Sequence, residues 1–387
     1  MAKGMYIGVD GKARKVKKTY VGVDNVARKV KKMYMGVDGV ARCIFSGGEL
    51  SYYGTATALS QTRYNLASTT VGNYALFGGG IKGNNSTGFT HYKTVDAYDT
   101  SLTRTTPSEL STSNKNSLSA TTVGNYGLFA GGYYRGSSNT YCDVVDAYDT
   151  SLTRTKVYLS KGRYSLASTT VGNYALFGGG YNYSALNVVD AYDTSLTRTQ
   201  PTELSVSRYS LASTTVGNYA LFGGGFYNTS KVYSTVDAYD TSLTRTTPTE
   251  LSNVRYSLAS TTVGNYGLFA GGAYIYGGSS SYGRKTVDAY DTSLTRTQPT
   301  ELSEYGVSFD ATTVGDYALF GGGSGYSNNY TDVVDAYDTS LTRTTPSKLS
   351  KARSHLTSTT VGNYALFGGG QTGASTCTST VDVYQVS

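Results

Sequence analysis

The stretch Val71-Gly-Asn-Tyr-Ala-Leu-Phe-Gly-Gly-Gly80 recurs, almost unchanged, seven times along the 387-residue chain. The copies begin at Val71, Val123, Val171, Val216, Val263, Val314 and Val361. Each copy is followed by a segment that differs from unit to unit, and then by Val-Asp-Ala-Tyr or Val-Asp-Val-Tyr. A period of roughly 50 residues is the length of one four-stranded repeat unit, so the sequence predicts seven such units in series.

Four short segments in each unit have the composition and alternation of β-strands. In the fourth unit, residues 209–216 form the first candidate strand, and the turn Gly217-Asn218 leads into a second at residues 219–222. Residues 236–239 form the third, and Thr244-Arg-Thr begins the fourth. Seven units of four strands predict an all-β fold, a seven-bladed β-propeller over residues 49–387.

The two ends of this region complement each other. The last unit stops at residues 381–387, after its third strand, whereas residues 50–59 precede the first unit and align with the outer strands of the others. We expect this N-terminal strand to complete the last blade. Such closure leaves only short, protected sheet edges.

These units resemble kelch repeats, in which a strand ends in Gly-Gly, a variable loop follows, and a strand with Tyr-Asp turns into the outermost strand. The resemblance covers about residues 49–387. The sequence departs from it at the outer strand, where Leu102-Thr-Arg-Thr105 stands at the position of a tryptophan. The resemblance implies the same blade architecture as the strand pattern.

The composition argues against several kinds of site. Three cysteines without Cys-x-x-Cys spacing predict neither a disulfide framework nor a zinc site. Two histidines are too few for a copper centre, and we expect no metal and no other cofactor. The sequence shows no signal peptide and no run of 18 apolar residues, so we expect no membrane insertion.

The variation between units falls on two of the four connections of a blade. The turns between strands 1 and 2 and between strands 3 and 4 are nearly constant, whereas the 2–3 and 4–1 segments differ in length and content. In an up-and-down blade the 2–3 and 4–1 connections lie on the same face of the disc. We therefore expect one variable face and one constant face.

The 2–3 segments are rich in Tyr, Ser, Gly and Asn, the mixture that antibody loops use for binding. Tyrosine offers rigid contact area, and the small polar residues adapt to a ligand. The candidate ligand-binding tyrosines are Tyr92, Tyr134, Tyr183, Tyr227, Tyr276 and Tyr326. The alternative is that these loops carry no function and only tolerate sequence drift.

An arginine recurs in the 4–1 segment of five units, and Asn114 and Gly306 replace it in the other two. A ring of arginines at the mouth of the central channel would bind carboxylate, phosphate or sugar hydroxyls. Alternatively, each arginine ties neighbouring blades together through backbone carbonyls, since its fork of donors serves both uses. The candidate ligand-binding arginines are Arg63, Arg163, Arg208, Arg255 and Arg353.

The carboxylates favour structure over catalysis. The aspartate of Val-Asp-Ala-Tyr occurs in every unit, which indicates a role in hydrogen bonding within each blade. A glycan-cleaving enzyme needs a pair of carboxylates, and the predicted inner strands offer only Asp310. We therefore expect no catalytic residues.

Residues 1–48 form a second repeat system, with Tyr6-Ile-Gly-Val-Asp-Gly11 recurring in similar form every 14 residues and basic segments between the copies. The Asp-Gly and Asp-Asn turns predict three β-hairpins, and their few apolar residues predict docking on a partner or self-association. The lysine clusters are alternatively a protection of exposed strand edges. Nucleic acid is not expected as a partner, because the clusters lack interleaved aromatic residues.

The 14-residue repeats joined to a propeller are similar to modules of tail or appendage proteins of phages that infect gut Firmicutes. This resemblance implies a virion protein whose N-terminal segment docks on other virion proteins or on itself, while the propeller faces the host. The expected function is non-enzymatic attachment, with the variable face binding a host-surface glycan or protein. Two alternatives stay open: a purely structural virion or assembly component, and a glycan-cleaving propeller enzyme.

Overall fold

The computed structural model describes residues 48–387 with their side chains, except residues 87, 114, 135–139, 229–230, 276–281 and 326–328, of which only the strand backbone at 276 and 280–281 is described. Before residue 48 it describes the backbone of six strands. They pair as β1 (Tyr6–Val9) with β2 (Lys12–Lys15), β3 (Tyr20–Val23) with β4 (Val26–Lys29), and β5 (Lys32–Val37) with β6 (Val40–Ser46). These pairings agree with the three hairpins expected from the sequence.

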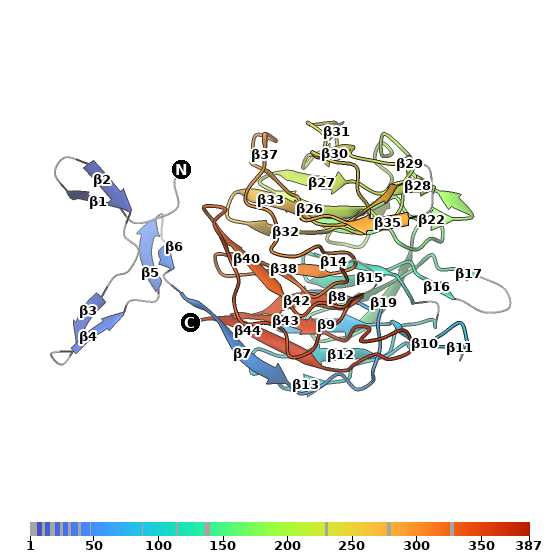
Figure 1. Cartoon of the computed structure of the whole chain (residues 1–387), viewed down its shortest axis with the longest axis horizontal. Coiled ribbons are helices and arrows are strands. Elements are labelled where there is room, and N and C mark those ends of the chain that lie inside the picture. The colour runs from blue at the N-terminus through green and yellow to red at the C-terminus, as the bar shows by residue number, and fades with distance from the viewer. Residues whose placement is uncertain are drawn as a thin grey trace.

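The described part of residues 50–387 forms seven four-stranded antiparallel sheets, which Figure 1 shows from the side. Their innermost strands contact one another in sequence, and the last contacts the first, so the sheets are the blades of a ring. The predicted all-β, seven-bladed propeller is therefore confirmed. The innermost strands are β8 (Ala67–Val71), β14 (Ser119–Val123), β20 (Ala167–Val171), β26 (Ala212–Val216), β32 (Ala259–Val263), β38 (Asp310–Val314) and β42 (Thr357–Val361). The second strands are β9 (Tyr74–Gly78), β15 (Tyr126–Ala130), β21 (Tyr174–Gly178), β27 (Tyr219–Gly223), β33 (Tyr266–Ala270), β39 (Tyr317–Gly321) and β43 (Tyr364–Gly368).

The third and fourth strands complete the blades toward the outside. The third strands are β12 (Val95–Tyr98), β18 (Val144–Tyr148), β24 (Val189–Tyr192), β30 (Val236–Tyr239), β36 (Val287–Tyr290), β40 (Val334–Asp338) and β44 (Val381–Val386). The outer strands are β13 (Arg104–Thr105), β19 (Arg154–Tyr158), β25 (Arg198–Thr199), β31 (Arg245–Thr246), β37 (Arg296–Thr297), β41 (Arg343–Thr344) and β7 (Leu50–Ala56). Five outer strands pair only Arg-Thr, and in each of them a proline, which cannot donate to a sheet, follows two residues later. Strand β19 has no such proline and is five residues long.

The repeated motif explains why the first two strands of each blade pair as a hairpin. Gly72 has a φ of 52°, the left-handed conformation that a two-residue hairpin turn requires at its first position. The turn sets the register Val71 opposite Tyr74 and Ala67 opposite Gly78. The second glycine, Gly78, is needed for packing, because a Cβ there would lie 2.8 Å from the ring of Phe129 in the next blade.

The hydrophobic core lies between adjacent blades. At the first interface, Val71, Leu76 and Ala97 of blade 1 pack against Phe129 and Tyr148 of blade 2, all of them almost fully buried. An equivalent cluster fills each of the other six interfaces of the ring. Every blade is therefore held mainly by its two neighbours, as in other repeat proteins.

Strand β7 closes the ring by pairing with β44 as the outer strand of the last blade. The N–H of Glu49 donates to the carbonyl of Ser387 at 3.0 Å, and the N–H of Val386 donates to Asn363 in the 1–2 turn of that blade. The chain therefore enters the propeller on the face of the constant 1–2 turns, beside the C-terminus.

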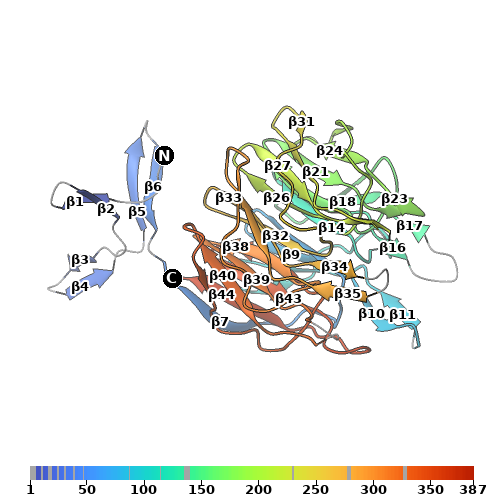
Figure 2. The ribbon, with the colours of Figure 1, turned by 45° about the horizontal axis from the view of Figure 1, so that its top comes forward.

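Five of the variable 2–3 segments form small hairpins of their own, which the sequence analysis did not predict. In Figures 1 and 2 these hairpins lie on the side of the ring away from β1–β6. Their strands are β10 (Ile81–Asn84) with β11 (Gly88–His91), β16 (Tyr133–Tyr134) with β17 (Thr140–Tyr141), β22 (Tyr181–Asn182) with β23 (Ser184–Ala185), β28 (Phe226–Asn228) with β29 (Lys231–Val232), and β34 (Ala273–Tyr276) with β35 (Ser280–Gly283).

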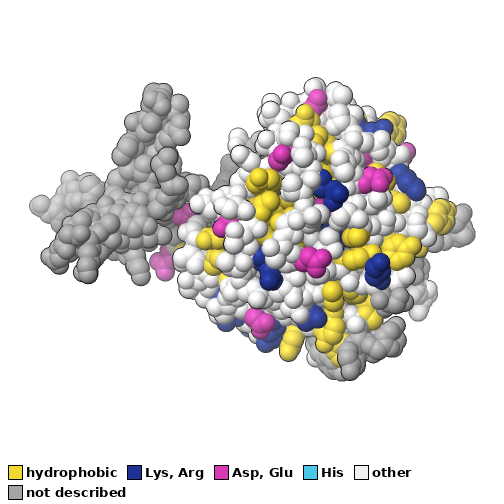
Figure 3. All heavy atoms as spheres, turned by 90° about the horizontal axis from the view of Figure 1, so that it is seen from above, with side chains coloured by type: hydrophobic (Ala, Val, Ile, Leu, Met, Phe, Trp, Pro, Cys, Tyr) yellow, Lys and Arg dark blue, Asp and Glu magenta, His cyan; other side chains and the backbone are white. Residues whose placement is uncertain are grey.

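The 4–1 segments lie against these 2–3 segments, as expected for connections on the same face. Single β-bridges join them in successive blades, for example Tyr64 with Ile81 and Tyr209 with Phe226. We call this side, formed by the 2–3 and 4–1 segments, the variable face, and the side of the 1–2 and 3–4 turns the constant face. Seen from the side of the disc (Figure 3), charged side chains of both signs are scattered among uncharged ones.

Candidate functional site

A buried ion pair lies inside most blades. Arg208 Nη2 is 2.6 Å from Asp237 Oδ2, and the same guanidinium donates to the carbonyls of Phe222 and Thr235. From the outer strand, Arg245 Nη1 lies 2.7 Å from the other oxygen of Asp237. The equivalent inner pairs are Arg63–Asp96, Arg163–Asp190, Arg255–Asp288 and Arg353–Asp382. The structural role predicted for the repeated aspartate is therefore confirmed.

The arginine ring predicted as a ligand site is wrong. Each inner arginine is fully buried and directs its donors to an aspartate and backbone carbonyls of its own blade, so none is available at the channel mouth. Burial lowers the pKa of Arg255 to about 10, opposed by the charge of Asp288, so this arginine is charged at neutral pH. The residues corrected in this way are Arg63, Arg163, Arg208, Arg255 and Arg353.

The alternative role, in which the arginine donors tie neighbouring blades together, fits only in part, because the side chains bond within their own blade and the backbone makes the contact between blades. The backbone carbonyl of Arg208 accepts the N–H of Gly180 from the preceding blade at 3.0 Å, and that of Arg255 accepts Gly225 at 2.8 Å. The backbone of each of these arginines therefore bonds across the seam, the boundary between two adjacent blades. Its side chain neutralises the aspartate of its own blade.

Two blades depart from this pattern. In the second blade Lys115, rather than Asn114, takes the arginine position: its Nζ lies 3.4 Å from Asp146 Oδ2 and 2.6 Å from the carbonyl of Val144. Asn114 itself lies outside the described residues. In the sixth blade Gly306 supplies no cation, and burial raises the pKa of Asp335, which keeps an ion pair with the outer Arg343 at 3.3 Å.

Three of the six predicted tyrosines are exposed on three consecutive blades of the variable face. The exposed fractions are 37% for Tyr134, 77% for Tyr183 and 42% for Tyr227. Tyr92 is on the same face but partly buried. The side chains of Tyr276 and Tyr326 lie outside the described residues, so their role stays a prediction.

A continuous band of aromatic rings crosses the variable face from blade 2 to blade 5. Tyr133 stacks on Tyr164 with ring centroids 4.8 Å apart, and Tyr209 packs against Phe226 at 4.1 Å. Tyr183 projects from the hairpin β22–β23 and contacts the band through Tyr141 at 4.8 Å. We call this the aromatic band; it consists of Tyr133, Tyr141, Tyr164, Tyr181, Tyr209, Phe226 and Tyr256.

The sequence analysis missed Tyr164, Tyr209 and Tyr256, although each follows an arginine directly in Arg-Tyr-Ser-Leu. The repeated Arg-Tyr pair was the available signal. Because the arginine turns into its blade, the next residue forms the β-bridge to the 2–3 segment and lies on the variable face. Of each Arg-Tyr pair, the sequence analysis chose the arginine as the candidate ligand-binding residue, whereas the tyrosine is the one on the variable face.

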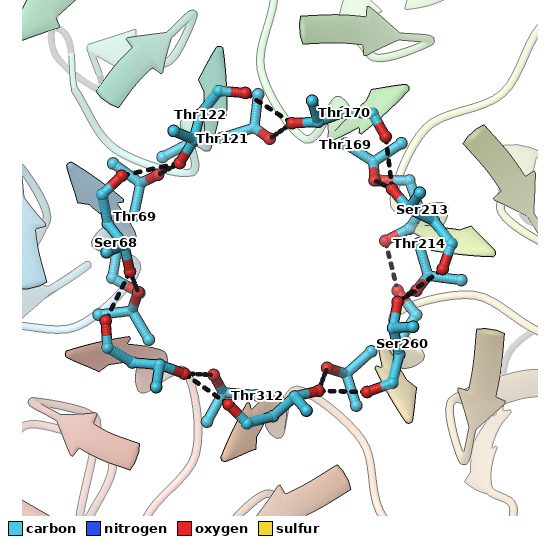
Figure 4. Close-up of a pocket in the computed structure, with 18 residues that line it drawn as sticks. Ser68, Thr69, Thr121, Thr122, Thr169, Thr170, Ser213, Thr214, Ser260 and Thr312 are labelled. Atoms are coloured by element: carbon cyan, nitrogen blue, oxygen red, sulfur yellow. Dashed lines mark hydrogen bonds between the residues drawn. The ribbon is translucent and has the colours of Figure 1, made fainter. Parts of the chain in front are cut away.

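The innermost strands enclose a central channel of about 340 Å³ that is lined by serine and threonine (Figure 4). The second threonine of each strand donates its hydroxyl hydrogen to the carbonyl of the second threonine in the preceding blade, as Thr170 does to Thr122 at 2.6 Å. This bond recurs at every seam around the ring. The first threonine pairs with the second threonine of the next blade, as Thr169 does with Thr215 at 2.8 Å, again at every seam.

Two titratable residues stand at the variable-face end of the innermost strands, Asp310 at the start of β38 and His355 just before β42. Asp310 stands where four other blades have alanine, and its Oδ2 accepts the N–H of Ser358 at 2.6 Å and the hydroxyls of Ser358 and Thr357. Burial raises the pKa of Asp310 to about 6 against these hydrogen bonds. His355 stands in a closed ring of backbone hydrogen bonds otherwise formed by serine and asparagine, and burial lowers its pKa to about 4.

Within the described residues, no cluster of three or more His, Cys, Asp or Glu side chains is arranged to hold a metal ion. The same residues include no helix of the length and apolar character needed to cross a membrane.

No family model matches the chain, and no curated protein sequence matches it. Among solved structures, that of YjhT is similar with a TM-score of 0.60 and 12% identity, over 76% of this chain and 99% of YjhT. Similarity at that identity shows the shared fold alone. Because 608 solved chains match, this fold is too widespread to indicate a function, which has to be argued from the site. The kelch repeats and the phage modules therefore remain resemblances.

Proposed function

We propose that this protein is a non-enzymatic attachment protein of a phage tail or another virion appendage, and that its variable face binds a host-surface glycan or protein. The observation that carries the proposal is the concentration of exposed tyrosines and of the aromatic band on the one face where the repeats diverge. Aromatic rings with a polar tip give large contact areas at low entropic cost, and divergent loops on a rigid scaffold are typical of binding sites.

The conformation of Tyr183 supports a binding role. This residue is 77% exposed and has a φ of 56°, a left-handed conformation that costs a residue with a side chain about 1–2 kcal/mol. The side chain extends away from the core, so the core gains little from it. The tight turn of hairpin β22–β23 therefore presents an exposed aromatic ring on the variable face, where a ligand can reach it.

The position of the N-terminal segment supports the same orientation. The chain enters the propeller on the constant face, next to the C-terminus, so hairpins β1–β6 connect to the face opposite the tyrosines. Docking of residues 1–48 on other virion proteins or on copies of this chain leaves the variable face open toward the host.

The test is binding of the full chain to a glycan array and to host cells, with the triple variant Tyr134→Ala, Tyr183→Ala and Tyr227→Ala. The matched control is Tyr53→Ala, because Tyr53 is 52% exposed but packs on Tyr364, beside the constant face. We expect the triple variant to lose at least tenfold in affinity, about 1.4 kcal/mol, and the control to bind as the wild type does.

Binding that survives in the triple variant contradicts the site. A wild-type chain that incorporates into virions but binds neither array nor cells supports the structural alternative instead. Release of free sugar from a bound glycan supports the glycan-cleaving enzyme.

A further inference from the structure

The hydroxyl hydrogens of the channel threonines all point into the wall. The second threonine, such as Thr215, donates its single hydrogen to the carbonyl of Thr170, so it can only accept in its bond with Thr169. Thr169 is therefore the donor of that bond. Because both bonds recur at every seam, neither threonine layer has a hydroxyl hydrogen left for a ligand.

The backbone of the same strands offers donors instead. In an antiparallel strand, the N–H and C=O of one residue point to the same side. The carbonyl of Ser213 faces away from the neighbouring strand of its blade, because it accepts the hydroxyl of Ser260 from the next blade at 2.7 Å. The N–H of Ser213 therefore also points toward the channel. Hydroxyls cap the carbonyls of all seven second threonines and that of Ser213, whereas the N–H groups beside them point into the channel without such a partner. This pattern gives that part of the wall the character of an anion site.

One seam shows what such a donor binds. Between blades 6 and 7, the carboxylate of Asp310 takes the N–H of Ser358 at 2.6 Å and its hydroxyl at 3.0 Å. Asp310 occupies the first position of its inner strand, and the serine it binds occupies the second position of the next one. The chain thus supplies its own carboxylate to this seam.

Two other seams have the serine but an alanine in place of the carboxylate. Ala167 and Ala212 hold the strand position of Asp310. In the blade that follows each of them, Ser213 and Ser260 hold the strand position of Ser358. Ser213 and Ser260 both line the channel. The strands involved follow Tyr164, Tyr209 and Tyr256 of the aromatic band, so both seams open toward the same part of the variable face.

We propose that the seams between blades 3 and 4 and between blades 4 and 5 bind a carboxylate group of a ligand that enters the channel from the variable face. At the first seam the carboxylate takes the N–H and the hydroxyl of Ser213, as Asp310 takes those of Ser358. At the second seam it takes the N–H of Ser260, because the hydroxyl of Ser260 donates to the carbonyl of Ser213. An acidic sugar and an acidic peptide both carry this group. The site is independent of host attachment, because it can be tested with the carboxylate alone.

The experiment is a titration of the full chain with sodium acetate, followed by the backbone amide signals in NMR spectra, with neutral acetamide as the matched probe. Acetate, but not acetamide, is expected to shift the amide signals of Ser213 and Ser260. Asp310→Ala places the residue of four other blades at this position and so keeps the fold. It is expected to add an acetate-dependent shift at Ser358.

Placing an aspartate at the two seams that have alanine tests whether a carboxylate of the chain itself blocks acetate there. The variants Ala167→Asp and Ala212→Asp are expected to abolish the acetate response at Ser213 and Ser260, respectively. Glucuronate or N-acetylglycine binding at least tenfold more tightly than acetate identifies the source as a sugar or a peptide. Equal shifts with acetate and acetamide, or no acetate-dependent shift at Ser358 in Asp310→Ala, overturn the proposal and leave the attachment proposal untouched.

Discussion

The two faces of the propeller are built from the same repeats, but the turns of one face are nearly identical and the hairpins of the other differ from blade to blade. On the constant face, Asp99 Oδ1 accepts the hydroxyl of Ser101 at 2.7 Å and the N–H groups of Ser101 and Thr103 at 2.9 Å each, and these hydrogen bonds lower its pKa. The same turn recurs in five further blades, around Asp149, Asp193, Asp240, Asp291 and Asp338. On the variable face, the hairpins of different blades share neither length nor side chains.

The difference shows where the fold is specified. A buried aspartate and an interface cluster fix every blade, and all but the sixth also have an inner arginine or lysine. The constant 3–4 turn is present in six blades, and all of these features lie away from the tips of the 2–3 hairpins. A face that contributes little to stability is free to diverge, as loops on rigid scaffolds commonly do. Substitutions in the constant features should therefore lower the free energy of unfolding, and substitutions on the variable face should change binding instead.

The largest expected effect on stability comes from Arg208→Ala. The change leaves Asp237 buried without its inner cation, which typically costs about 3–5 kcal/mol for a broken buried pair. Chemical denaturation of the full chain measures it. Arg245→Ala is the matched control, since Arg245 pairs with the same aspartate but is partly exposed, and about 1 kcal/mol or less is expected. Equal losses in the two variants contradict the role given to the inner arginine.

The pH dependence of stability comes next in size and concerns two residues at the variable-face end of the innermost strands. The pKa of His355 is about 4 in the folded chain, below the ordinary 6.5, so its contribution to stability is lost as pH falls through that window. The pKa of Asp310 is about 6, above the ordinary 3.8, so the folded state gains stability as pH falls through that window. The two effects oppose each other between about pH 6.5 and pH 4.

Single variants separate these opposed effects. His355→Ser should remove the acid-labile contribution, and Asp310→Ala should expose it, each by about 2–3 kcal/mol between pH 7 and pH 4. Free energies of unfolding measured across this range test both signs. Three parallel curves for the wild type and the two variants would refute the assignment.

A smaller effect is expected in the threonine rings that both faces share. Thr215→Val keeps the shape but removes the donor to Thr170 and the acceptor for Thr169, at a cost of about 1 kcal/mol. Thr215→Ser keeps the hydroxyl and serves as the control. Thermal unfolding should show a lower midpoint for the valine variant only, and a loss as large as that of Arg208→Ala would mean that the rings hold the blades together.

The smallest effect on stability is expected on the variable face. Tyr183→Ala removes an exposed side chain, so the free energy of unfolding should change by less than about 0.5 kcal/mol. The same denaturation experiment measures it beside Arg208→Ala. A loss above about 2 kcal/mol would show that the hairpin supports the fold, and the contrast between the faces would fail.

The features of the fold that follow from the repeat pattern could be predicted from the sequence. Seven copies of one motif specify the number of blades, and the likeness of residues 50–59 to the outer strands specifies closure by β7. The division into two faces follows from which connections repeat.

The direction of a side chain could not be predicted in the same way. Arg208 is paired with Asp237, which lies 29 residues away and becomes its neighbour only when the third strand joins the sheet. In the second blade, likewise, only the folded sheet shows that Lys115, rather than Asn114, lies beside the buried aspartate Asp146. Two-residue strands such as those of β22–β23 carry too little alternation to be recognised from sequence.

The most direct measurement is a hairpin exchange in the full chain, with residues 181–188 of the third blade replaced by residues 371–380 of the seventh. The exchange changes Tyr181 and Tyr183 but leaves the arginine–aspartate pairs in place. If the variable face is the binding face, the glycan-array profile and host-cell binding should change while the midpoint of thermal unfolding stays within about 2 °C. An unchanged binding profile in a folded exchange variant would contradict it.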